Sequence, residues 1–257
     1  MPTRRPPAPW ALLAACLGLL LPAVPARAAE PAQPGTFQPL TVEDASPIER
    51  GQAEAALAFR WDHVEEGDDL FEARPRLKLG ALPGLELELA APYRFGDEGE
   101  GDLRASAQYA LTRGGGALPA LGVEMGVTRT YGSRQDTEAE LKALATQPLT
   151  RRGGSGPSLH LNLSWLRLLD AGPAERGDRY AAVVGYSQPV GQDTALVLDL
   201  AHEQERGEGR ETNIAEAGLR RRLPGDLVLS AGAGLGLDAD SPDFRMVVGL
   251  QHSFRLF

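Results

Sequence analysis

The chain has 257 residues, a net charge of -9 at pH 7 and one cysteine, and its length suits one large domain or two small ones. The acidic balance argues against nucleic acid as a partner, because binding to phosphates requires an excess of basic side chains. A mature transmembrane helix is also excluded, since it needs about 20 consecutive apolar residues and no such run follows the N-terminus.

The N-terminus has the pattern of a secretory signal peptide. Arg4 and Arg5 precede an apolar run at 10–21, and the small residues that follow end in Ala26-Arg27-Ala28, an A-x-A cleavage pattern. We predict a signal peptide over 1–28 and export through the inner membrane. A short membrane anchor is the alternative, although the run is short for a spanning helix.

Cys16 offers a second alternative, since Leu13-Ala14-Ala15-Cys16 resembles a lipoprotein cleavage box in the middle of the apolar run. If Cys16 is removed with the signal peptide, the mature chain has no cysteine, which excludes disulfides and thiol chemistry. The next segment, 29–48, is predicted to be a flexible, extended periplasmic linker, because it contains Pro31, Pro34, Pro39 and Pro47.

The rest of the chain alternates apolar and polar residues with period two, the pattern of strands with two different faces. In the sharpest run, Phe71, Ala73, Leu77 and Leu79 alternate with Glu72, Arg74, Arg76 and Lys78. Similar runs lie at 53–62, 85–95 and 103–111. A soluble antiparallel sheet also alternates, with its apolar face inward. Strands of about ten residues, with no helical layer to cover an apolar face, favour instead strands that cross a bilayer.

Two kinds of connection alternate along the chain, as an up-and-down barrel requires. The short ones, rich in glycine and proline, lie at 80–84, 113–119, 190–194 and 223–226. The charged ones lie at 63–69, 96–101, 132–136, 170–178, 205–211 and 238–243. Outer-membrane barrels have short periplasmic turns and longer extracellular loops, so we assign the first set to the periplasm and the second to the outside.

One segment breaks this alternation. Residues 137–147 read TEAELKALATQ, which favours a helix by propensity, but a helix here would leave an odd number of strands. As a strand, the segment points Ala139, Leu141, Ala143 and Ala145 outward and Glu138, Glu140 and Lys142 inward. We therefore predict a strand at 137–147, a periplasmic turn at 151–156, and further strands near 158–168, 179–189, 195–205, 212–222, 227–237 and 244–256.

The predicted fold class is an all-β, up-and-down antiparallel transmembrane β-barrel of about 12 strands over 49–257, preceded by the signal peptide. Outward aromatic residues support it, because aromatic rings prefer the two membrane–water interfaces. Trp61, Phe71, Phe95, Trp165, Tyr180 and Phe244 fall at the outer end, and Tyr109, Tyr186 and Phe254 at the periplasmic end. A final amphipathic strand ending in Phe254, with Phe257 in a short extension, resembles the C-terminal signal read by the barrel assembly machinery.

The inward face carries charges of both signs. The candidates for lumen-lining residues are Arg60, Glu72, Arg74, Arg76, Lys78, Glu86, Glu88, Arg94, Arg104 and Glu124. A tight hairpin register sets Glu54 against Lys78 and Arg60 against Glu72, then Lys78 against Glu86 and Arg76 against Glu88, so that opposite charges face each other across strands. Two interpretations remain open: a charged constriction that selects solutes, or a lattice of ion pairs that fills a narrow interior.

Other site chemistry has weaker support. The acidic loops at 65–69, 96–100 and 238–240 could hold Ca²⁺ or bridge lipopolysaccharide through divalent cations, but none has EF-hand spacing. His160, Asn162 and Ser164 share one strand face, and residues of these types serve in lipid hydrolases, but no G-x-S-x-G elbow is present. We therefore predict no catalytic residues, no cofactor-binding residues and no metal site.

With these strands assigned, the sequence resembles the bacterial outer-membrane transporter family of the "MetA pathway of phenol degradation" type over roughly 40–254. The resemblance rests on Phe71-Glu72-Ala73-Arg74-Pro75-Arg76, Ala91-Pro92-Tyr93-Arg94-Phe95 with Gly96-Asp97, Gly101-Asp102-Leu103, Gly185-Tyr186-Ser187-Gln188-Pro189, and the stretch from Asp240-Ser241-Pro242-Asp243-Phe244-Arg245 through Gly249-Leu250 to Phe254. It implies a barrel that passes small, aromatic or hydrophobic molecules, and it implies no catalytic residues.

Three functions follow as hypotheses. The leading one is a passive channel or transporter-like barrel in the bacterial outer membrane, not an enzyme, with a small-molecule solute and with outer-membrane lipid and lipopolysaccharide as surroundings. The second is a closed structural or adhesive barrel that acts through its acidic loops. The third, more remote, is a membrane-embedded lipid hydrolase that uses Ser164.

Overall fold

The computed structural model describes residues 40–64, 67, 69–96, 99–115, 118–132, 134–150 and 156–256. The predicted signal peptide over 1–28, with Cys16 in it, lies outside these residues, as do Phe257 and parts of the acidic loops at 65–69 and 96–100. No helix in the described part of the chain is long and apolar enough to span a membrane.

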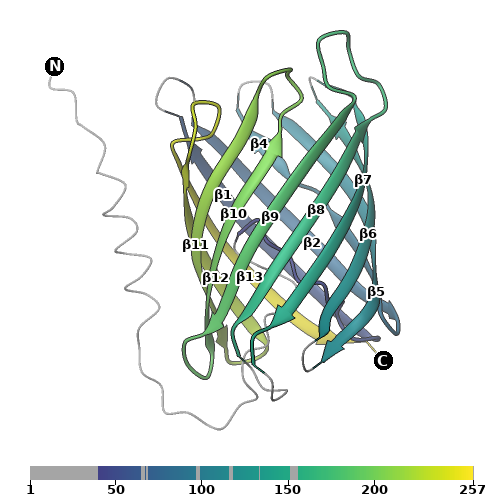
Figure 1. The fold of residues 1–257 in the computed structure, drawn as a ribbon, viewed down its shortest axis with the longest axis vertical. Helices are drawn as coiled ribbons and strands as arrows, with labels where there is room; N and C mark the ends of the chain where they lie inside the picture. Colours follow the sequence, from purple (N-terminus) through teal and green to yellow (C-terminus); the bar gives the residue numbers. More distant parts are fainter. Residues whose placement is uncertain are drawn as a thin grey trace, which may run out of the picture.

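The described chain forms one antiparallel sheet that closes into a barrel (Figure 1). Its strands are β1 (Gln52–His63), β2 (Leu70–Leu82), β3 (Leu85–Ala90), β4 (Tyr93–Phe95), β5 (Glu100–Gly115), β6 (Leu118–Tyr131), β7 (Thr137–Pro148), β8 (Ser158–Leu168), β9 (Asp178–Pro189), β10 (Thr194–Gln204), β11 (Glu211–Leu223), β12 (Leu227–Gly236) and β13 (Phe244–Arg255). Apart from β3 and β4, which both pair with β2 and β5, each strand pairs with its neighbours in the sequence, and β1 pairs with both β2 and β13. The sheet therefore has no free edge.

The 13 strands make a 12-stranded barrel, because β3 and β4 follow each other along one line between β2 and β5. Pro92 lies between them and has no N–H to donate to a ladder. The chain still keeps contact there, since the Asp102 amide donates to the Pro92 carbonyl at 2.9 Å and the Ala91 amide donates to the Pro75 carbonyl at 3.0 Å. The predicted barrel is confirmed, with one predicted strand interrupted at Pro92.

The helix-prone segment is strand β7, as the parity argument predicted. Its Leu141 is exposed on the outer face, whereas Glu140 and Lys142 take part in ion pairs inside the barrel. The pairing of β7 with β6 and β8 is regular over its length. The hydrogen bonds of the closed sheet and the outward apolar residues outweigh the helix propensity of this sequence.

The register of the first hairpin is confirmed, and that of the second is wrong by two residues. Glu54 faces Lys78 and Arg60 faces Glu72, but Lys78 faces Glu88 rather than Glu86. The cause is a turn at Pro83–Gly84, where Gly84 has a φ of 80°, with a register shift between Gly80 and Leu82. The predicted charge pairs nevertheless form diagonally, at 2.6 Å for Lys78–Glu86 and 3.5 Å for Arg76–Glu88.

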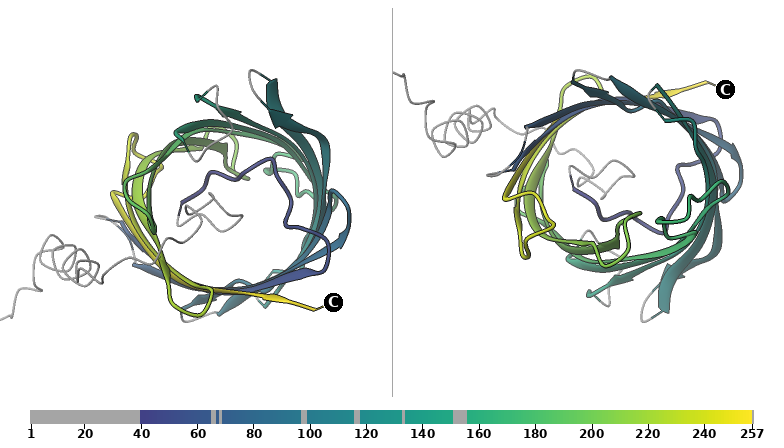
Figure 2. Two further views of the ribbon diagram at one scale, coloured as in Figure 1. Left: turned by 90° about the horizontal axis from the view of Figure 1, so that it is seen from below. Right: turned by 90° about the horizontal axis from the view of Figure 1, so that it is seen from above.

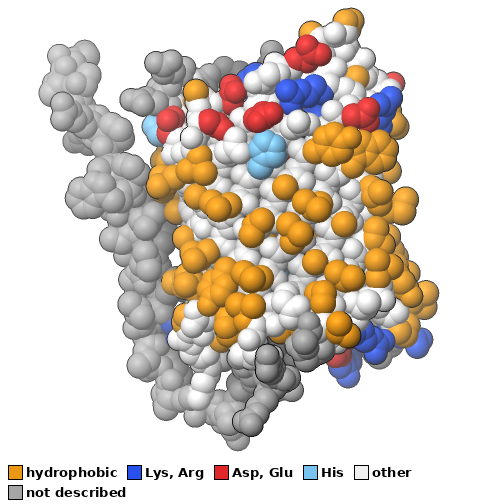
Figure 3. Space-filling model, viewed as in Figure 1, with side chains coloured by type: hydrophobic (Ala, Val, Ile, Leu, Met, Phe, Trp, Pro, Cys, Tyr) orange, Lys and Arg blue, Asp and Glu red, His pale blue; other side chains and the backbone are white. Residues whose placement is uncertain are grey.

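The outer surface carries an apolar belt with charged residues at both ends (Figure 3). Rings gather at the end that bears the longer loops, where the ring centroid of Trp61 lies 6.4 Å from that of Phe71 and 6.1 Å from that of Phe244. Leucines and aromatic side chains stay exposed along the strands, Phe95, Leu163 and Tyr180 among them. Such a belt suits a hydrocarbon environment between two interfaces.

Leu163 tests this belt, because it lies at the middle of β8 and is exposed outward. We expect Leu163→Arg to lower the free energy of unfolding in lipid vesicles by about 2–4 kcal/mol, the penalty for a charge at the bilayer midplane. Leu169→Arg is the matched control, because Leu169 is also exposed but lies just beyond the strand end, where the penalty is about 0–1 kcal/mol. Equal effects of the two substitutions in urea titrations would contradict the assignment of a lipid-facing belt.

Candidate functional site in the barrel lumen

Residues 40–50, here called the lumenal strap, run inside the ring of strands before entering β1 (Figure 2). The wall holds the strap by its main chain, one strand after another. The Thr41 amide donates to Glu216 at 3.1 Å, the Val42 amide to Asp199 at 2.9 Å, the Glu43 amide to Asn162 at 2.7 Å, the Ala45 amide to Thr146 at 3.0 Å and the Ile48 amide to Glu86 at 2.9 Å. These acceptors come from β11, β10, β8, β7 and β3, so the strap follows the wall around the lumen.

Glycines in the wall make room for the strap. A Cβ at Gly185 on β9 would lie 2.5 Å from a Val42 methyl, and a Cβ at Gly232 on β12 would lie 2.5 Å from a Leu40 methyl. On β6 a Cβ at Gly122 would lie 2.9 Å from the Ala45 carbonyl oxygen, and on β2 a Cβ at Gly80 would overlap the Glu49 carbonyl oxygen. Two features of the wall therefore determine the path of the strap: side-chain acceptors that bind its main chain, and glycines that leave room for it.

The strap changes the interpretation of the segment predicted as a flexible linker over 29–48. Its residues 29–39 lie outside the described residues, but residues 40–48 are hydrogen-bonded into the lumen, and Val42 and Ala45 are fully buried. Val42 packs against Val183 and Val197. For residues 40–48 the description as a free linker is corrected, because each end of this stretch is tied to a different part of the wall.

The periplasmic half of the lumen is a lattice of buried ion pairs. Lys78, 4% exposed, lies 2.6 Å from Glu86 and 3.3 Å from Glu88. Nearer the chamber, Arg104 pairs with Glu124 and, at 2.6 Å, with Glu140. Of the predicted lumen-lining residues, Lys78, Glu86 and Glu124 are buried in these pairs, and Glu72 is buried closer to the loop end, 3.0 Å from Arg60.

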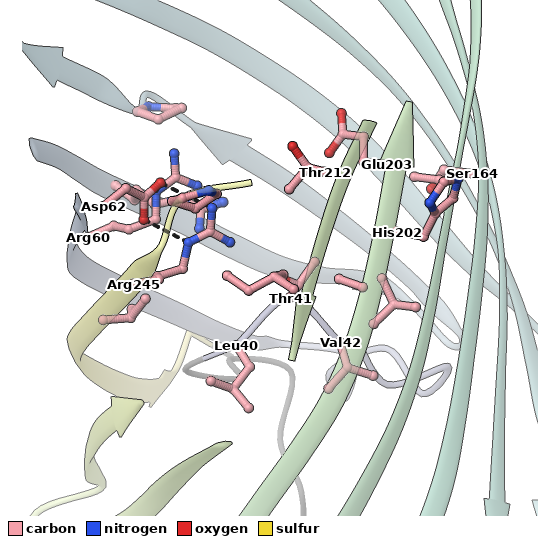
Figure 4. Close-up of a pocket in the computed structure, with 18 of the residues that line it drawn as sticks. Leu40, Thr41, Val42, Arg60, Asp62, Ser164, His202, Glu203, Thr212 and Arg245 are labelled. Carbon is pink, nitrogen blue, oxygen red and sulfur yellow. Dashed lines mark hydrogen bonds and ion pairs between the residues drawn. The ribbon is translucent and has the colours of Figure 1, made fainter. Parts of the chain in front are cut away.

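The outer half of the lumen holds a chamber of about 760 Å³. Arg60, Arg74, Arg76, Glu88, Arg94 and Arg104, which are the remaining predicted residues, all line it. Residues 40–43 of the strap also line it, and Figure 4 shows Leu40, Thr41 and Val42 between two walls. On one wall Asp62 bridges Arg60 at 3.4 Å and Arg245 at 2.8 Å; Ser164 and Glu203 lie on the other. Sequence reasoning missed Arg245 and the strap residues.

Above the chamber lies a charged vestibule of about 490 Å³ at the loop end. Arg94, Glu203, Glu205 and Arg210 line both cavities, so the two adjoin each other. Arg206 connects the loops around it, since its guanidinium lies 2.6 Å from Asp136 and its carbonyl accepts the Arg176 amide at 2.8 Å. The mouth is thus held by contacts between loops.

Hydrogen bonds to Asp238, the first residue of the loop at 238–243, hold this loop in place. The Ser241 hydroxyl donates to Asp238 at 2.6 Å, and Asn213 also donates to this carboxylate. These hydrogen bonds, that from Ser241 first, hold the pKa of Asp238 below its usual value. Asp238 therefore stabilises a turn beside the mouth, with Ser241 lining the chamber.

The structure does not bring the predicted serine and histidine together. Ser164 donates to Glu140 at 2.8 Å, while His160 contacts Thr146 at 3.1 Å and Ser187 at 2.9 Å. Asp44 lies 3.9 Å from His160, so a serine, a histidine and an aspartate do meet, but all three are buried and none lines a described cavity. Within the described ranges, no group of three or more His, Cys, Asp or Glu side chains could hold a metal ion.

A closed antiparallel barrel with an apolar belt, short turns at one end and longer loops at the other has the architecture of bacterial outer-membrane β-barrels. Solved structures with this fold include the COG4313 outer membrane channel from Pseudomonas putida F1, which matches with a TM-score of 0.62 and 16% identity over 84% of this chain and 100% of that chain. The KdgM porin in complex with disordered oligogalacturonate has a TM-score of 0.56 and 12% identity over 78% of this chain and 99% of that chain.

The NanC porin has a TM-score of 0.52 and 10% identity over 80% of this chain and 100% of that chain. No protein-family model and no curated protein matches the sequence. The chain therefore shares its fold with outer-membrane porins and channels.

Proposed function

We propose that the protein is a passive outer-membrane channel for small solutes and has no enzymatic activity. One observation carries the proposal: a chamber of about 760 Å³ lies inside the closed barrel and adjoins the charged vestibule at its outer mouth. Charged side chains along a water-accessible lumen are the means by which barrels admit and select polar solutes. The fold shared with the COG4313 channel and two porins supports this function.

The experiment is a recording in planar lipid bilayers. We expect the purified mature protein to give discrete conductance steps, because ions would enter the lumen through the vestibule and the chamber. The same protein, denatured before reconstitution, is the control. A correctly folded barrel that inserts without any conductance and passes no solute in vesicle flux assays would overturn the proposal.

We further propose the finer assignments that accompany this function. The resemblance to the "MetA pathway of phenol degradation" type supports small aromatic or hydrophobic molecules as solutes. The amphipathic strand β13, with an exposed Phe254, supports recognition by the barrel assembly machinery, and Phe257 would add to that signal. Lipopolysaccharide would contact the outer loops, and lipid would contact the apolar belt.

A closed structural or adhesive barrel is the second candidate, and the filled periplasmic half of the lumen favours it. Deletion of the loop at 205–211 distinguishes the two candidate functions, because Arg206 and Arg210 from this loop line the vestibule. For a channel, deleting 205–211 should change permeability. For an adhesive barrel, the deletion should abolish a surface phenotype and leave permeability unchanged.

A further inference from the structure

The outer chamber has two chemically different arcs. Its cationic arc comes from adjacent strands, β13, β1, β2, β4 and β5, and consists of Arg245, Arg60, Arg74, Arg76, Arg94 and Arg104. On the facing strands β8 to β11 the chamber is lined by a group of apolar residues, here called the apolar arc: Leu166, Ala181, Val183, Ala201 and Ile214. Asn162, Ser164, His202, Glu203 and Thr212 lie among them on the same strands. Leu40 and Val42 of the strap extend the apolar surface.

Most guanidinium groups of the cationic arc are held by carboxylates at close range. Arg60 lies 3.0 Å from Glu72, Arg245 lies 2.8 Å from Asp62, and Arg104 lies 2.6 Å from Glu140. An anionic solute would have to displace these partners, which are themselves buried. Such arginines shape the wall and its potential but offer few donors to a ligand.

Arg74 differs from the other arginines of this arc. Its side chain is 50% exposed, and its ion pair with Glu72 is long, at 3.8 Å. Within the described part of the chain, Arg74 has no hydrogen-bond partner within 3.5 Å, while Glu72 already pairs with Arg60. A planar guanidinium has five N–H donors in a fork that fits a carboxylate, so Arg74 offers the chamber a donor set that the protein itself leaves largely unused.

We propose that this chamber is a binding site for organic anions with an apolar body, with the carboxylate on Arg74 and the body against the apolar arc and the strap. The volume of about 760 Å³ falls within the range of about 300–1,000 Å³ that small-molecule pockets occupy. The inference deepens the proposed channel function and rests on it for the route by which a ligand enters.

The first test compares ligands that share a body or a head group. 4-Phenylbutyrate has both features, 4-phenylbutan-1-ol lacks the charge, 4-phenylbutylamine reverses it, and acetate lacks the apolar body. We expect 4-phenylbutyrate to interrupt the single-channel current in bilayers and to bind the protein in lipid nanodiscs, and each of the other compounds to bind at least about tenfold more weakly. Equal affinity for the alcohol, or for acetate, would overturn the inference.

The second test uses Arg74→Gln, with Arg113→Gln as the matched control. Arg113 is exposed near the periplasmic end of β5 and lines neither cavity, so both variants lose one positive charge. In Arg74→Gln, loss of the hydrogen bond to the carboxylate should weaken 4-phenylbutyrate binding about tenfold. In Arg113→Gln, the affinity for 4-phenylbutyrate should be unchanged. Equal affinity in the two variants would assign the anion to another site and overturn the inference.

The nanodisc measurement separates the two proposals, because it requires no conduction. A protein that conducts ions but binds 4-phenylbutyrate no better than acetate remains a channel and lacks this site. A protein that binds 4-phenylbutyrate through Arg74 but carries no current has the site and is not a channel. Both variants must show the heat-modifiable gel mobility of the folded barrel before their affinities are compared.

Discussion

Deleting residues 29–48, so that the signal peptide joins Glu49 directly, is expected to raise the single-channel conductance several-fold. The deletion removes nearly all of the lumenal strap, and with it the main-chain atoms that Glu216, Asp199, Asn162, Thr146 and Glu86 now hold. The freed wall groups would face water in a wider lumen, where ions pass more readily.

Gly185→Leu is a milder form of the same experiment. A Cβ at Gly185 already lies 2.5 Å from a Val42 methyl, so a leucine must displace the strap there. Expelling Val42, which is fully buried, should reduce the free energy of unfolding by about 1.5–3 kcal/mol while the conductance rises. Gly191→Leu is the matched control, because a Cβ at Gly191 meets nothing within 4 Å.

The conductance of both strap variants and of the control would be measured in the same bilayer system. If deletion of 29–48 leaves the conductance of the folded barrel unchanged, then the ion-pair lattice, and not the strap, limits flow. If Gly191→Leu acts as strongly as Gly185→Leu, the fit between Gly185 and Val42 has no special role.

The barrel was predictable because its signal repeats along the chain. Each lipid-facing residue must be apolar and each neighbour must face the lumen, so the alternation survives in almost every strand. Parity then outweighed the helix propensity of 137–147, since an odd number of strands would put the two chain ends on opposite sides of the membrane and reverse the character of the later turns. Local propensity alone would have failed at this segment.

The strap was not predicted, because the prolines of 29–48 suggested a linker. A main chain that is held by side-chain acceptors also produces no periodic pattern in its own sequence. The sequence signal for the strap lies instead in the strands of the wall. The runs at 179–189 and 212–222 alternate poorly because Val183 and Ile214 face inward, toward apolar residues of the strap or the chamber. Inward glycines such as Gly185 are the second signal. Apolar and glycine residues on a lumen face predict that some segment packs against them.

The division of the lumen into an ion-pair lattice and a chamber also could not be predicted from the sequence. The predicted charged residues do all face inward, but their roles depend on depth and on the strap, which covers some and leaves others open. Lys78 and Arg74 lie four residues apart on β2, yet Lys78 is buried among carboxylates and Arg74 is half exposed. The alternation pattern predicts only that both side chains point inward, and it does not distinguish a buried residue from an exposed one.

Lys78→Met is expected to destabilise the barrel by about 3–5 kcal/mol, the usual loss when one partner of a buried ion pair is removed. Lys78 lies 2.6 Å from Glu86, which is 2% exposed, and it faces Glu54 on the adjacent strand β1. Without the ammonium group, these carboxylates would remain charged in a closed interior. The measurement is the urea midpoint and slope for the protein in lipid vesicles.

Two further variants show whether burial is the cause. Arg167 and Asp178 form an equally close pair, at 2.5 Å, but their side chains are 49% and 43% exposed, so Arg167→Ala should cost only about 0–1 kcal/mol. Adding Glu86→Gln to Lys78→Met removes one uncompensated charge and should recover part of the stability. If Lys78→Met unfolds at the same urea concentration as the wild type and only its ion selectivity changes, the periplasmic half of the lumen is a selectivity filter and not a structural lattice.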